Sequence, residues 1–109
     1  MPDMVTGHRP WFGGVRAAGP GTHEPIHAPA GGIVASANDM AKYLAMWVNG
    51  QDDVLSARAK REMMQPSGPT SPLYGLGWFI DAERGMVYHT GLVPGAETLM
   101  SFNPDDRKG

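Results

Sequence analysis

The stretch YGLGWFIDAERGMVYHTGLVPGAETLMSFN, from Tyr74 to Asn103, decides the fold. It contains three segments rich in aromatic and aliphatic residues, 74–80, 86–90 and 98–102, and two turns that contain glycine separate them. Such runs between turn residues are typical of strands joined as hairpins, so we predict a three-stranded antiparallel meander. His89-Thr90-Gly91 would then end the central strand, and a glycine there lets a ligand approach the backbone closely.

Side chains alternate between the two faces of the central strand, and this limits which of them can reach one cleft. In a regular strand Val87 and His89 share one face, and Thr90 lies on the other. The side chains of His89 and Thr90 would both enter one cleft only if the strand twists there or lies at an edge of the sheet.

Residues 36–50 carry the clearest helix pattern in the chain. Ser36 followed by Asp39 forms a capping box, and Gly50 supplies a stop. An apolar stripe at helical spacing predicts that this helix covers the sheet; it consists of Met40, Tyr43, Leu44, Trp47 and Val48.

A shorter helix is predicted after Ser56, which would be its N-cap, and Pro66 would stop it. Leu55, Ala59 and Met63 would form its apolar side. Its three basic residues, Arg58, Lys60 and Arg61, are interpreted as a solvated face, with an anion site as the minor alternative.

Residues 1–32 hold seven glycines and five prolines and show no period of 3.6 or 2.0. We predict a long loop, anchored by Trp11 and Phe12, followed by an α+β portion over residues 33–109. The loop contains His23-Glu24-Pro25-Ile26-His27, which fits the H-E-x-x-H pattern of zinc peptidases. The nearby prolines leave room for less than two helical turns, so loop histidines without metal are the favoured interpretation.

Composition narrows the class of protein. Leu, Ile, Val and Phe supply 19 of the 109 residues, so the core must be modest. We therefore expect a globular piece that is stabilised by contacts outside itself. The net charge is −2 with no basic block, which argues against nucleic-acid binding, and no apolar run is long enough for a membrane span. The absence of cysteine excludes disulfides and thiol catalysis and leaves the compartment open.

Three stretches, taken in order, resemble a known family. Residues 29–41, PAGGIVASANDMA, are similar to the P-A-G-G-L-x-S-T-A-x-D-L-A segment of the serine β-lactamase and penicillin-binding-protein-like family, in the branch of class C β-lactamases, D-alanyl-D-alanine peptidases and related esterases. Residues 74–78 resemble its Y-G-L-G-W stretch, and residues 89–95 resemble its H-T-G-x-x-P-G stretch. Ser36-Ala37-Asn38 also spells the family's S-x-N element, but the capping box, the stripe and the stop favour a helix cap.

The resemblance implies an α+β fold of the β-lactamase type, with hydrolysis of an ester, peptide or β-lactam through an acyl-serine and no cofactor or metal. By the same resemblance His89, Thr90 and Gly91 would bind the substrate. His89 would support substrate and base, Thr90 would offer its hydroxyl to the substrate, and the backbone N–H of Leu92 would be an oxyanion donor. None of the five serines has a lysine three residues later, and no tyrosine precedes Asn by two. The chain therefore resembles a C-terminal fragment that is inactive alone, and a non-catalytic binding module of the same fold is the alternative.

Histidine in place of the family's common lysine changes the expected substrate. Imidazole is mostly neutral at pH 7 and holds a carboxylate less firmly than an ammonium does, which favours ester or peptide substrates over β-lactams. Leu92 is bulkier than the small residue that is usual after this glycine. Because the family would continue beyond Gly109 with a strand and a helix, we also expect self-association, strand exchange or a companion polypeptide.

Overall fold

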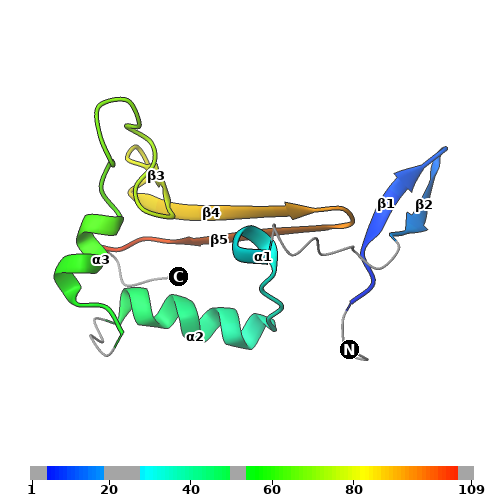
Figure 1. Ribbon diagram of the computed structural model, residues 1–109, viewed down its shortest axis with the longest axis horizontal. Helices are drawn as coiled ribbons and strands as arrows, with labels where there is room; N and C mark the ends of the chain where they lie inside the picture. The colour runs from blue at the N-terminus through cyan, green and yellow to red at the C-terminus, as the bar shows by residue number, and fades with distance from the viewer. Residues whose placement is uncertain (1–4, 19–27, 50–53, 106–109) are drawn as a thin grey trace. The chain divides into compact units, whose positions relative to one another are not determined.

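The computed structural model describes residues 5–18, 28–49 and 54–105 of the chain (Figure 1). Within these ranges it contains a two-stranded and a three-stranded antiparallel sheet and three helices. The elements in chain order are β1 (His8–Trp11), β2 (Gly14–Ala17), α1 (Ala28–Gly31), α2 (Ala37–Val48), α3 (Ala57–Met63), β3 (Phe79–Asp81), β4 (Met86–Val93) and β5 (Ala96–Phe102). This content confirms the predicted α+β class.

The predicted meander is present, with strand order β3-β4-β5 and β4 in the centre. β4 and β5 are longer than predicted, because the turn between them contains only Pro94 and Gly95. Proline presets its own φ, and Gly95 has a φ of 87°, so two residues suffice to reverse the chain. His89-Thr90-Gly91 therefore lies inside β4, and its predicted place at the end of the strand was wrong.

The first predicted strand was too long. Only Phe79–Asp81 forms β3, paired with β4 from Phe79↔Tyr88 to Asp81↔Met86. Tyr74 makes an isolated bridge to Phe79, and the residues between them turn the chain, with a φ of 83° at Gly77. Glycine tolerates this left-handed conformation, which the alternation of bulky residues did not reveal.

Gly75 fastens this turn to the end of α3. A Cβ atom at this position would collide with the carbonyl oxygen of Met63 and would lie 2.8 Å from that of Gln65. Next to it, the N–H of Leu76 donates to the carbonyl of Met63 at 2.8 Å. The turn and the helix can approach this closely only because residue 75 has no side chain.

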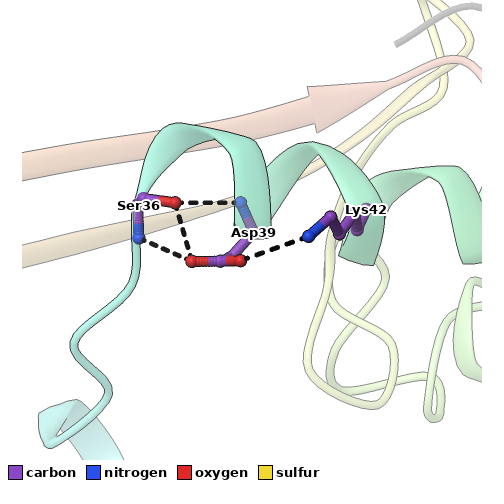
Figure 2. Close-up of polar contacts among 3 residues, drawn as sticks. All are labelled: Ser36, Asp39 and Lys42. Carbon is purple, nitrogen blue, oxygen red and sulfur yellow. Dashed lines mark hydrogen bonds and ion pairs between the residues drawn. The ribbon is translucent and has the colours of Figure 1, made fainter.

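α2 begins with the predicted capping box (Figure 2). The Ser36 hydroxyl accepts from the N–H of Asp39 at 3.2 Å, and the Asp39 carboxylate accepts from the N–H of Ser36 at 3.2 Å and from its hydroxyl at 2.7 Å. Lys42 lies 3.7 Å from the other carboxylate oxygen as an exposed ion pair. The bonds from Ser36 lower the pKa of Asp39. Asn49 is the C-cap, while Gly50 lies outside the described residues.

α3 confirms Ser56 as N-cap, since its hydroxyl accepts from the N–H of Ala59 at 3.2 Å. The prediction of a solvated basic face was wrong for Lys60, which is buried. Its ammonium donates to the carbonyl of Met46, in the last turn of α2, at 2.7 Å. The carbonyls at a helix C-terminus carry partial negative charge and attract cations, so Lys60 joins the two helices.

The core is small and mostly aromatic. Its buried apolar residues are Trp47, Trp78, Val87 and Phe102. Trp78 meets Trp47 and Phe102 edge-on, with ring centroids 5.2 Å apart in both pairs. Because Trp47 belongs to α2 and Phe102 to β5, these contacts confirm that α2 covers the sheet.

The predicted loop over residues 1–32 contains regular structure. β1 and β2 form a hairpin whose turn residues Phe12 and Gly13 have φ values of 39° and 80°. Two positive φ values are typical of a type I′ turn, which glycine and asparagine favour and phenylalanine does not. Two guanidiniums, those of Arg9 and Arg16, lie 5.9 and 5.5 Å from the centroid of the Trp11 ring. Their cation–π contacts hold the hairpin's side chains together.

The chain divides into two compact units, Met1–Val34 with Thr90–Thr98 and Ala35–His89 with Leu99–Gly109. Within the first unit the base of the β1–β2 hairpin contacts Gly95. The N–H of His8 donates to the carbonyl of Gly95 at 3.1 Å, and a Cβ on Gly95 would lie 2.7 Å from that of Ala18. Gly95 is thus required both for the turn and for this close approach.

Candidate functional site

His89 is half-buried on β4 and is hydrogen-bonded by its side chain. Its Nε2 lies 3.2 Å from the hydroxyl oxygen of Tyr74. The imidazole also contacts the ring of Phe79, with centroids 5.6 Å apart. Among the described residues, Nε2 is the one nitrogen of this ring with a hydrogen-bond partner, which leaves Nδ1 for other contacts.

His89 belongs to an aromatic cluster that also contains Tyr74, Phe79 and Tyr88. Phe79 lies in its centre: Tyr74 meets it edge-on at 4.6 Å, and Tyr88, its partner across the β3–β4 ladder, stacks on it at 5.2 Å. Aromatic pairs at these distances stabilise one another by about 1 kcal/mol beyond the area they bury. The cluster therefore restricts the orientation of the His89 ring.

Tyr74 is itself fixed by its main chain. Its carbonyl accepts from the N–H of Ser67 at 3.0 Å and from the Ser67 hydroxyl at 3.1 Å. Its N–H donates to the carbonyl of Ser71 at 3.3 Å, and its backbone bridges Phe79. Because the N–H and the carbonyl of Tyr74 are both hydrogen-bonded, its Cα is fixed and its side chain starts from a defined position.

The other three predicted site residues continue along β4 and belong to the first unit, whereas His89 belongs to the second. Thr90 is exposed. A Cβ on Gly91 would lie 2.6 Å from the hydroxyl oxygen of Thr98, so a side chain at position 91 would require the Thr98 side chain to shift. Leu92 has 81% of its surface exposed, which puts its bulk in solvent in this chain.

Three of the described serines use their hydroxyls in structural hydrogen bonds. Those of Ser36 and Ser56 cap α2 and α3, and that of Ser67 donates to the carbonyl of Tyr74. The Ser36 hydroxyl takes part in the capping box, which agrees with its interpretation as a helix cap.

An ion pair closes the turn that brings the chain from β3 into β4. Arg84 donates from its guanidinium to the Asp81 carboxylate at 2.7 Å and from its backbone N–H at 3.1 Å. These bonds lower the pKa of Asp81 and raise the pKa of Arg84. Asp81 is therefore held ionised as a structural group of the turn.

No metal centre is formed by the described residues, which contain no group of three His, Asp or Glu side chains placed to hold an ion. The predicted H-E-x-x-H residues, His23, Glu24 and His27, lie outside the described ranges. Within the described ranges, no helix combines the length and the apolar character that crossing a membrane requires.

Sequence reasoning missed Tyr74 as the partner of His89. Its place in the Y-G-L-G-W stretch was noted, but the bond joins positions 15 residues apart and depends on the turn at Gly77. The only signal in the sequence is an aromatic residue in one strand-like segment and a histidine in the next, and that pattern is common in sheets without function.

Comparison with known proteins now adds to this geometry. The family model described as Beta-lactamase matches residues 2–109, which is nearly the whole chain. Searches of curated proteins and of solved structures found no individual match. The helices and antiparallel sheets described above agree with an α+β part of a β-lactamase-like fold, which is a serine-hydrolase-like fold. The chain belongs to the Beta-lactamase family.

Proposed function

We propose that this chain supplies the His89 strand to the active site of a serine hydrolase of the class C-like branch, which cleaves an ester, peptide or β-lactam through an acyl-serine. The observation that carries the proposal is the H-T-G stretch on the central strand of the sheet, with the His89 ring fixed by Tyr74. The family match over residues 2–109 supports the reaction class. Neither a metal nor a cofactor enters this chemistry.

Three groups on β4 receive roles in this proposal. His89 gives hydrogen-bond support to substrate and base, Thr90 offers its hydroxyl to the substrate, and the backbone N–H of Leu92 is one oxyanion donor. β3 pairs with β4 only as far as Tyr88. From His89 onward, β3 no longer covers the edge of β4 that it faces, and every second N–H along a strand points toward the same edge. A donor aimed at a developing oxyanion contributes roughly 3 kcal/mol.

The nucleophile and the base come from another segment of polypeptide. A serine becomes a nucleophile only beside a base, and the sequence contains neither Ser-x-x-Lys nor Tyr-x-Asn. We therefore assign the chain to the C-terminal portion of the catalytic domain and expect it to be inactive alone.

Exposed apolar side chains support the need for a partner. Several large ones are more than half exposed, including Leu73 (66%), Leu76 (57%) and Leu99 (67%). Covering these side chains with another surface would be favourable, because it removes apolar area from water. The partner is a second copy, by association or strand exchange, or the polypeptide that carries the remaining motifs. Light scattering should show an assembly, and a tightly folded monomer would contradict this part.

A second candidate is a non-catalytic module that binds a ligand through the His89 strand. The lack of a nucleophile motif in the sequence favours it, because a fixed histidine can hold a ligand without cleaving it. A zinc peptidase at His23, Glu24 and His27 is the third and weakest candidate. Stoichiometric zinc that is lost in His23→Ala would support it.

A fluorophosphonate or penicillin probe tests the first proposal. The chain alone should not be labelled, whereas an assembly with a polypeptide that carries Ser-x-x-Lys and Tyr-x-Asn should be labelled on that polypeptide. His89→Ala should slow this labelling, and His8→Ala, which changes an exposed histidine outside β4, is the matched control. Covalent labelling of a serine in the chain alone would overturn the claim that its nucleophile is elsewhere, and an assembly that binds ligand without being labelled would favour the binding module.

A further inference from the structure

We propose that Tyr74 is a positioning residue that makes His89 a hydrogen-bond donor at Nδ1 in both of its charge states. It rests on the proposed function of His89 and explains how a histidine on this strand can act as a hydrogen-bond donor, as a lysine does. It starts from the 3.2 Å contact between the Tyr74 hydroxyl and Nε2.

We take the Tyr74 hydroxyl as the donor of this bond, on the chemistry of the two groups. Among the described residues, Nε2 is the hydrogen-bond partner of the Tyr74 hydroxyl, and a phenol donates well to a neutral imidazole nitrogen. The hydrogen bond at one ring nitrogen decides which nitrogen carries the proton in the neutral ring. If Tyr74 donates to Nε2, the proton of neutral His89 must lie on Nδ1.

Protonation of His89 does not change the group that it presents at Nδ1. When the ring gains its second proton, Nε2–H donates to the oxygen of the Tyr74 hydroxyl, and the hydroxyl hydrogen turns away. Nδ1 still carries its proton. The free edge of His89 is therefore a donor before and after protonation, as a lysine ammonium is always a donor.

The matching ligand group is an acceptor, such as the carbonyl or carboxylate oxygen of an ester or peptide. Without Tyr74, the neutral ring could carry its proton on Nε2 and would present a bare Nδ1 that repels such an oxygen. The surroundings suit this role, because the Tyr74 main chain is bonded to Ser67 and Ser71 and its ring packs against Phe79.

The first test measures the tautomer directly and needs no activity. Nitrogen-15 NMR of the ring in the full chain, recorded at about pH 8 where imidazole is mostly neutral, should show Nδ1 protonated and Nε2 bare. Tyr74→Phe should abolish this preference, whereas Tyr88→Phe removes a hydroxyl from the same cluster and should retain it. A wild-type ring protonated at Nε2 overturns the proposal, and this spectrum decides even if Tyr74→Phe does not fold.

The second test uses labelling of the assembled hydrolase across pH. Tyr74→Phe should lower the labelling rate roughly tenfold near pH 8, where an imidazole is mostly neutral, and much less near pH 5, where an imidazole is mostly protonated. Tyr88→Phe should follow the wild-type profile. An equal loss at both values would indicate a purely structural role and overturn the proposal. If the Nδ1 tautomer is observed but no assembly is ever labelled, the proposed function fails while the positioning of His89 by Tyr74 stands.

Discussion

The ammonium of Lys60 donates a 2.7 Å hydrogen bond to the carbonyl oxygen of Met46, so that a buried cation from α3 closes the last turn of α2. Lys60→Met keeps most of the side chain's volume and removes the donor. We expect a loss of about 1–3 kcal/mol in the free energy of unfolding, because a part-buried carbonyl loses a charged partner. Urea denaturation measures it. Arg61→Met, at an exposed site on the same helix, should stay within about 0.5 kcal/mol of wild type.

Ser36 is predicted to act in stability and not in chemistry. Ser36→Ala removes the acceptor for the Asp39 N–H and should cost about 1 kcal/mol, whereas Ser36→Asp retains a good N-cap and should cost less. Thermal unfolding compares the two variants. In the assembled hydrolase both should be labelled by the fluorophosphonate probe at the wild-type rate, and a severe loss of labelling in both would restore Ser36 as a site residue.

Acid should weaken the turn between β3 and β4. The Asp81 pKa is lowered by its bonds with Arg84, so the native state binds fewer protons than the unfolded state. The stabilisation is complete above the unfolded pKa of about 3.9 and is lost as the pH falls through the lower folded pKa. Denaturation midpoints between about pH 7 and pH 2 should fall less steeply for Asp81→Asn than for wild type. Equal slopes would show that the bond with Arg84 does not persist in solution.

Gly75→Ala should disrupt the contact between the Tyr74 turn and α3. The added methyl group would collide with the Met63 carbonyl, and such overpacking typically costs 1–3 kcal/mol. Gly68→Ala is the matched control, since a Cβ there meets nothing within 4 Å, and it should be close to neutral. Calorimetry provides the comparison. Equal midpoints for the two variants would contradict the close approach of residue 75 to the helix.

Phe12→Asn should stabilise the β1–β2 hairpin. Phe12 is 94% exposed and has a φ of 39°, so it holds a left-handed conformation without burying its ring. Asparagine adopts that conformation more readily and gives the Asn-Gly pair favoured in type I′ turns, a gain of roughly 1 kcal/mol. Amide hydrogen exchange across β1 and β2 should slow. Faster exchange would indicate that Phe12 contributes packing that the exposed ring does not show.

Features that depend on neighbours in the sequence were predictable. The capping box of Ser36 and Asp39, the Ser56 cap and the central place of β4 follow from spacings of a few residues, and the structure contains all three. The stripe on α2 also correctly gave Trp47 as a core residue. Local chemistry decides such features, so tertiary structure does not need to be known.

Features that depend on which distant segments come together in space were not predicted. The burial of Lys60 requires the end of α2 beside α3, and the Tyr74–His89 bond requires the turn at Gly77. The first hairpin was hidden because Pro10 interrupts its alternation and Phe12 stands where a turn residue is expected. Intrinsic preferences were outweighed there by pairing and packing.

The contact of His8 and Ala18 with Gly95 has a consequence for the order of folding. It joins the beginning of the chain to a turn near its end, and closing so long a loop costs entropy that local hairpins do not have to overcome. The β4–β5 hairpin, closed by two residues, should form early, and the N-terminal hairpin should dock on its tip late. Partial unfolding should then begin at the N-terminus, leaving the strand that bears His89 intact after residues 5–18 have detached.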